Sequence, residues 1–197
     1  MRTSLFLLFT LTWGLAAAPA SDAETWTLEP EESRLFFGSI KADAVGESHQ
    51  FQEFSGQVDE TGRFDLTIDL ASLETGIDIR NKRMREFLFE TANFDQATLV
   101  GELDLDAYRD LAVGEMTRTS LTATLSLHGA ENELQADVAA VRLADNKVAV
   151  FPAQLMFINA EAYGLGDGVD KLRQLAGLPS IASAVPLSFN LVFTRDH

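Results

Sequence analysis

The most regular feature of the chain is an alternation of apolar and polar residues that begins at Trp26 and continues almost to the C-terminus. Leu66, Ile68 and Leu70, for example, alternate with Thr67 and Asp69. A period of two is typical of β-strands that bury one face. The pattern predicts eight strands, at residues 34–42, 51–58, 64–70, 98–105, 121–128, 133–143, 147–159 and 187–194.

Turn-forming residues separate these segments, among them the runs at residues 59–62 and His128-Gly129. Alternating strands joined by short turns favour an all-β protein with antiparallel pairing. An eight-stranded sheet that closes on itself has an interior that side chains just fill, or that just holds one small ligand. Two short helices are also expected, at residues 80–89 and 169–176, where apolar residues recur at helical spacing. Residues 164–168 are expected to form a flexible loop before the second helix.

Small residues bear on whether the interior is filled. Ala123, Ala136, Ala140 and Ala153 fall on candidate inward rows beside leucines and phenylalanines. They either leave an apolar void, which would bind an apolar ligand, or make room for helices and neighbouring phenylalanines. The periodicity leaves both interpretations open. The residues expected to form the wall of a pocket are Phe37, Phe51, Leu66, Ile68, Leu125, Leu155, Phe157 and Phe189.

The first residues have the three-part pattern of a secretory signal peptide, expected to span residues 1–23. The small residues that follow the apolar run allow cleavage after Ala20 or after Ala23, and the second is favoured because a proline interrupts the first site. The apolar run is shorter than the ~20 residues that a spanning helix needs. Residues 24–197 are therefore expected to form one soluble domain in a Gram-negative periplasm, without stable membrane insertion.

Composition excludes several classes of function. The formal charge of −15 disfavours binding to nucleic acid, whose phosphates require basic partners. The absence of cysteine excludes disulfides, thiol catalysis and cysteine-based metal sites. His49, His128 and His197 lie far apart without metal-binding spacing, and no nucleophile or nucleotide motif is present. We therefore expect no metal, no cofactor and no enzymatic activity.

Basic residues concentrate in one place in this acidic chain, at Arg80, Lys82, Arg83 and Arg85. One interpretation is a patch near a barrel mouth, where Arg80 and Arg83 contact a phosphate or carbonyl head group. The other is a solvated helix face whose charges pair with nearby glutamates and Asp95.

Six segments form a recognisable series along the chain: the opening strand at residues 26–37, Phe54-Ser55-Gly56, Leu73-Glu74-Thr75-Gly76, Arg80-Asn81, Phe94-Asp95 and Ser126-Leu127-His128-Gly129. These segments resemble the YceI-like (polyisoprenoid-binding) family, over a stretch from about Trp26 to Phe193. The chain departs from the family pattern at Asn81, where many members have aspartate, and at residues 162–186, which exceed the short loop typical of the family.

This resemblance implies a lipocalin-like, eight-stranded antiparallel barrel with a deep apolar pocket, exported to the periplasm. It implies non-enzymatic binding of a long isoprenoid, either a quinone or a polyprenyl phosphate. A second hypothesis is a stress-response or interaction protein with a filled barrel, in which residues 164–186 dock a redox or membrane partner. The sequence leaves open whether the lipid is carried or stored, and whether the protein forms a homodimer.

Overall fold

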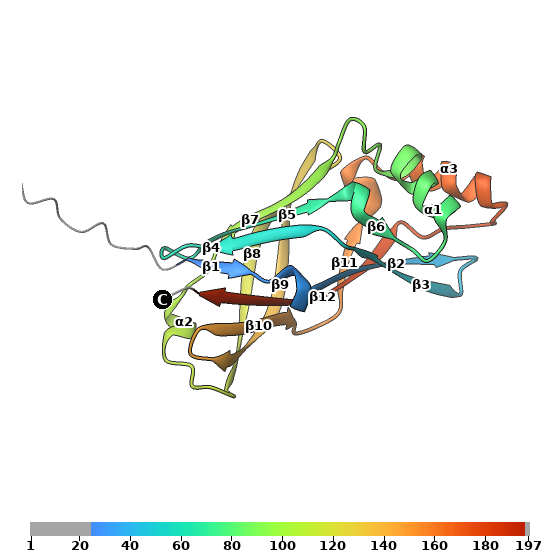
Figure 1. Ribbon diagram of the computed structural model, residues 1–197. Helices are drawn as coiled ribbons and strands as arrows, with labels where there is room; N and C mark the ends of the chain where they lie inside the picture. The colour runs from blue at the N-terminus through green and yellow to red at the C-terminus, as the bar shows by residue number, and fades with distance from the viewer. Residues whose placement is uncertain (1–24, 196–197) are drawn as a thin grey trace, which may run out of the picture.

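Successive antiparallel pairings bring the chain back to its own first strand, so that the sheet closes into a barrel (Figure 1). The structure is a computed structural model and describes residues 25–195. β12 returns to pair with β1, at Trp26↔Arg195 and Leu28↔Phe193. The closed ring runs in the order β1 (Trp26–Leu28), β4 (Phe54–Val58), β5 (Arg63–Asp69), β7 (Gln96–Glu102), β8 (Met116–Leu127), β9 (Ala130–Ala144), β10 (Lys147–Pro152) and β12 (Ala184–Arg195). The predicted all-β, eight-stranded antiparallel barrel is confirmed.

Further strands lengthen the wall toward one end of the ring. β2 (Arg34–Lys41) continues β1 after the short helix η1 (Pro30–Glu32), and β3 (Val45–Phe51) precedes β4. β2 pairs with both β12 and β3, and these strands reach the end of the molecule where the helices α1 and α3 lie in Figure 1. The remaining short strands, β6 (Leu73–Glu74) and β11 (Met156–Asn159), pair with β3 and β12.

Buried Ser33 holds the break between β1 and β2. Its hydroxyl oxygen accepts a hydrogen bond of 2.9 Å from the backbone N–H of Val192, and only 1% of Ser33 is exposed. The side chain thus takes the place of a backbone acceptor where the strand is interrupted.

The helical segments gather mainly at one end of the barrel. α1 (Asp78–Arg83) runs into the single π-helical turn η3 (Met84–Leu88), close to the predicted helix at residues 80–89. α3 (Gly166–Ala176) packs on η3 and ends at Gly177, which has a left-handed φ of 64°. The helix therefore begins inside the segment expected to be a loop. The other helical turns are η2 (Leu70–Ser72), α2 (Asp106–Arg109) and η4 (Ala160–Tyr163).

Two of the sequence motifs meet at the turn between β8 and β9. His128 and Gly129 form this two-residue turn, and both have positive φ, 52° and 76°, as a type I′ hairpin requires. The Phe94 ring lies 4.4 Å from the His128 ring, measured between centroids. His128 Nε2 lies 3.1 Å from a carboxylate oxygen of Glu90. None of the helices between residues 25 and 195 is long and apolar enough to cross a membrane.

Candidate functional site

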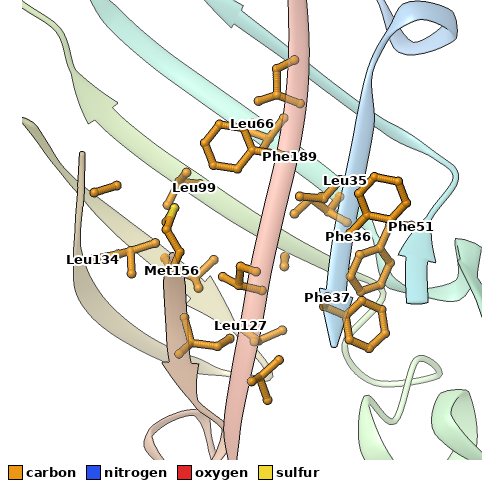
Figure 2. A pocket seen from close by; sticks show the side chains of 18 of the residues that line it. Leu35, Phe36, Phe37, Phe51, Leu66, Leu99, Leu127, Leu134, Met156 and Phe189 are labelled. Carbon is orange, nitrogen blue, oxygen red and sulfur yellow. The ribbon is translucent and has the colours of Figure 1, made fainter. Parts of the chain in front are cut away.

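The barrel encloses a cavity of about 1250 Å³. This volume exceeds the ~300–1,000 Å³ of most small-molecule pockets. Figure 2 shows Phe37, Leu66 and Phe189, from three different strands, among the side chains that line it. Aliphatic and phenylalanine side chains form most of the wall, including Leu35, Phe37, Phe51, Leu66, Ile68, Leu99, Leu125, Leu127, Leu134, Met156, Phe189 and Leu191.

Strand alternation explains which of the predicted wall residues reach this cavity. The inward residues of β5 and β12 follow one another at every second position, as the sequence pattern indicated. Six predicted wall residues line the cavity: Phe37, Phe51, Leu66, Ile68, Leu125 and Phe189. Whether they contact a ligand stays a prediction.

The other two predicted wall residues are on the outside, and that part of the prediction is wrong. Leu155 is 84% exposed and Phe157 is 52% exposed, and neither lines the cavity. Met156 and Ile158 face inward instead. Both rows of this segment are apolar, so alternation did not show which row faces the interior.

The four alanines on the candidate inward rows also differ in whether they face the interior. Ala136 and Ala140 line the cavity, where their small side chains leave room between β9 and the opposite wall. Ala123 is buried, whereas Ala153 is exposed and was wrongly placed on an inward row.

The wall becomes polar toward the β2–β3 end. Across this strand pair, Phe37 faces His49, and Ser39 faces Glu47 two residue pairs further along. All four side chains line the cavity, together with Lys41. The inward row therefore changes from apolar to hydrogen-bonding within two strand pairs.

Hydrogen bonds and ion pairs hold this polar end together. Glu47 accepts 2.9 Å and 2.8 Å contacts from Lys41 Nζ and Arg80 Nη1, one on each carboxylate oxygen. Ser39 Oγ lies 3.0 Å from His49 Nε2. The hydrogen bond from Lys41 is the main cause of a lowered pKa at Glu47. Burial lowers the pKa of His49 below 6.5, and the nearby positive charge of Arg80 acts in the same direction.

Both predicted head-group residues lie at this end. Arg80 comes from α1 and pairs with Glu47 of β3 rather than with acids of its own helix, and its Nη2 donates to the carbonyl of Thr75 at 2.6 Å. Arg83 lines the cavity, and its Nη1 donates to the carbonyl of Leu175 in α3 at 3.4 Å. The cluster thus joins strands and helices at the cavity end, and a contact with a ligand head group stays a prediction.

Asn81 ties α1 to the preceding motif. It is 2% exposed, and its Oδ1 accepts hydrogen bonds from both the backbone N–H and the hydroxyl of Thr75, at 2.9 Å and 2.5 Å. Its Nδ2 donates to a carboxylate oxygen of Glu74 at 3.0 Å. An amide therefore fits here as donor and acceptor at once, which an ionised aspartate would not do.

Residues 162–186 cover the same end of the cavity. The apolar side chains that α3 and its neighbouring residues turn toward it are Leu165, Val169, Leu172, Ala176, Leu178 and Ile181. Gly168 is buried, and a Cβ at this position would lie 2.5 Å from the carbonyl oxygen of Phe87 and 2.8 Å from Cα of Leu88. The glycine therefore permits close contact between α3 and η3.

The polar cluster on β2 and β3 was missed by sequence reasoning. Ser39, Lys41, Glu47 and His49 occupy alternate positions that continue the inward row of Phe37. Their spacing of two residues from the inward row of Phe37 was the feature of the sequence that could have identified them. Within residues 25–195 no group of three or more acidic or histidine side chains is placed to hold a metal ion.

Comparison with known proteins agrees with the barrel fold. The model of the YceI-like domain matches residues 26–193. A solved polyisoprenoid binding domain from Saccharophagus degradans, implicated in plant cell wall breakdown, is 38% identical. Its alignment covers 87% of this chain and 98% of that one, with a TM-score of 0.84.

Two more distant structures show the same fold. Burkholderia cenocepacia BcnA is 22% identical, with a TM-score of 0.66 over 84% of this chain and 98% of its own. A mutant Campylobacter jejuni YceI protein is 14% identical, with a TM-score of 0.55 over 76% of this chain and 84% of its own. No curated protein sequence matches the chain. The family model and the 38% identical structure together show that the chain belongs to the YceI-like domain family.

Proposed function

We propose that this protein is a non-enzymatic binding protein that holds one long isoprenoid chain inside the barrel. The observation that carries the proposal is the apolar cavity of about 1250 Å³. The polyisoprenoid binding domain from Saccharophagus degradans, 38% identical, supports an isoprenoid over other apolar ligands. An isoprenoid quinone and a polyprenyl phosphate are the two classes of cargo that we consider.

Burial of the tail supplies the affinity. Each CH₂ group removed from water contributes about 0.8 kcal/mol. Association itself costs about 4–15 kcal/mol, so several isoprene units must be enclosed before binding becomes useful. Three phenylalanine rings cluster in the cavity wall beside its polar end. The centroids of Phe37 and Phe51 are 4.9 Å apart, and Phe89 lies 5.8 Å from Phe51.

We also propose that the protein acts in the periplasm. The support is the signal-peptide pattern at residues 1–23, which lies outside the described residues. The filled interior required by the second hypothesis is inconsistent with the cavity, so we do not propose a protein that only docks a partner.

Native mass spectrometry with organic extraction tests the binding proposal. The protein is purified without detergent from the cells that naturally produce it, so that it keeps its natural ligand. We expect an adduct of one lipid per barrel that extracts as an isoprenoid. A protein that carries no adduct, and that takes up no added isoprenoid, would contradict the proposal.

A further inference from the structure

Side chains that line the cavity are exposed at two places, and these places differ in polarity. The exposed side chains beside α2 are polar, namely Glu60, Thr61 and Arg109. Those beside α1 and α3 are apolar, namely Ile77, Ile79 and Ala176. The apolar wall of the cavity therefore continues to the outer surface beside α1 and α3. This is the end at which a lipid tail can enter along apolar side chains.

Exposed apolar side chains are grouped around this opening. Ile77 is 48% exposed and Ile79 is 54% exposed, and Leu175 near the end of α3 is 37% exposed. Arg83 Nη1 donates to the carbonyl of Leu175 at 3.4 Å, so the ends of the two helices lie side by side. The β2–β3 hairpin reaches the same end in Figure 1 and adds Val45, which is 46% exposed. We call Val45, Ile77, Ile79 and Leu175 the apolar rim. Grouped apolar side chains on a surface mark a site of interaction, whereas single ones need no partner.

The charge of this end differs from that of the rest of the chain. Residues 39–49, 74–90 and 166–182 form it, and they carry seven basic and eight acidic side chains. The end is therefore nearly neutral, although the whole chain has a net charge of −15. Screening limits electrostatic interactions to about 8 Å at physiological ionic strength, so a surface that touches the rim meets mainly these balanced charges. Lys82 of α1 and Lys171 of α3 are exposed and offer ammonium groups to phosphates at that surface.

We propose that the apolar rim docks on a lipid bilayer, so that the isoprenoid passes between the membrane and the cavity without crossing water. This role rests on the proposed function, because an apolar cargo is what gives the opening its use. The acyl region of a bilayer accepts the rim side chains, while lipid phosphates accept hydrogen bonds from the flanking lysines. A second copy of the chain seated on the rim would instead cover the opening and block the tail.

The rate at which the protein gives up its cargo to vesicles tests the docking. Protein loaded with geranylgeraniol, an isoprenoid alcohol of twenty carbons, is mixed with phosphatidylcholine vesicles, and native mass spectrometry follows the loss of the adduct. We expect the rate to rise in proportion to the vesicle concentration, because each transfer needs a contact with a vesicle.

The rim variant is Val45→Ser/Leu175→Ser, since these two rim residues do not line the cavity. We expect its transfer rate to fall about 3–10-fold, because two partly exposed apolar side chains no longer enter the bilayer. Its affinity for geranylgeraniol in solution stays at the wild-type value. The matched control is Val113→Ser/Leu155→Ser, whose side chains are 57% and 84% exposed and also lie outside the cavity. This control should transfer as wild type does.

A charge variant tests the balanced charges independently. Lys82→Glu makes the rim surroundings acidic, and it should slow transfer to vesicles that contain phosphatidylglycerol at least about threefold. Arg118→Glu is its control, because it makes the same change of charge at an exposed position on β8 that does not line the cavity.

The outcomes separate the docking from the binding. A transfer rate that is independent of vesicle concentration, or that falls equally in the rim variant and its control, overturns the docking. A dimer that the rim variant converts to a monomer in analytical ultracentrifugation assigns the rim to a second copy and also overturns it. If wild-type protein takes up no geranylgeraniol from solution, the proposed function itself is wrong.

Discussion

His49 lies beside the ring of Phe37 and near the positive charge of Arg80. These surroundings disfavour the protonated imidazole. Burial is the larger cause of its lowered pKa, and Arg80 is the second. Between the folded pKa and the ordinary value of 6.5, the unfolded chain binds a proton that the folded chain does not. The stabilisation is therefore present above pH 6.5 and is lost as the pH falls.

A first prediction follows for the ligand-free protein. Its free energy of unfolding should decrease between pH 7.5 and pH 5.5, and the decrease should be smaller in His49→Gln. Urea denaturation at several pH values measures this. The lower limit of pH 5.5 keeps Glu47 ionised, because its lowered pKa places its own loss of stability below 4.5. Equal pH slopes in the two proteins would refute the account of His49.

A second residue-scale prediction concerns Asn81. In Asn81→Asp the donor to Glu74 is replaced by a second carboxylate, at a contact that is now 3.0 Å. Because like charges this close repel, the melting temperature at pH 7 should fall. Adding Glu74→Gln should restore it, since the amide of the new glutamine can donate to the aspartate. If the double variant melts no higher than the single one, the contact is not the reason for asparagine here.

At this scale the sequence placed Leu66, Ile68, Leu125 and Phe189 on the cavity wall because one row of β5, β8 and β12 is clearly apolar. It could not place Leu155 and Phe157, where Val150, Met156 and Ile158 make the other row equally apolar. Burial then depends on where neighbouring strands lie, which the period of two does not contain.

At the scale of elements, α3 closes the polar end because Gly168 allows it to lie against η3. In Gly168→Ala the new Cβ meets backbone atoms of Phe87 and Leu88 that cannot rotate away. We expect α3 to separate from η3 at a cost of about 1–3 kcal/mol in the free energy of unfolding. Backbone amides of α3 should exchange faster with solvent, and bound isoprenoid should leave faster.

Gly166→Ala is the control for this third prediction. Gly166 lies in the same helix, but a Cβ there meets only a side-chain carbon of Glu161, at 3.5 Å. Hydrogen exchange followed by mass spectrometry compares α3 with β8 in both variants. The same exchange in the two variants would mean that close packing at Gly168 does not hold the cover.

The sequence predicted elements well where apolar alternation was strong. β5, β8 and β12 were recognised, and β2 was predicted to within one residue. β3 was largely missed because its inward residues include Glu47 and His49, so the strand shows no apolar row. Polar residues on the inward row of β3 weaken its apolar alternation and also make this end of the cavity polar. The polar end was therefore the part hardest to predict.

At the scale of the whole molecule, an acidic chain encloses an apolar cavity with a basic and hydrogen-bonding end. The net charge of −15 keeps such molecules apart in solution. Closure pairs β1 with both β4 and β12, so neither end of the eight-strand ring is left as a free edge. This arrangement suits the proposed binding of an isoprenoid inside the barrel.

The central claim is that the isoprenoid occupies the barrel interior, and one paired comparison tests it most directly. Leu125 lines the cavity and is 8% exposed, whereas Leu155 lies outside and is 84% exposed. Both are changed to tryptophan, and the uptake of geranylgeraniol is measured by native mass spectrometry. We predict that Leu155→Trp binds as wild type does, while Leu125→Trp, still folded, binds less because the indole projects into the cavity and narrows the space for the tail. Undiminished binding in Leu125→Trp, or an equal loss in both variants, would contradict the claim.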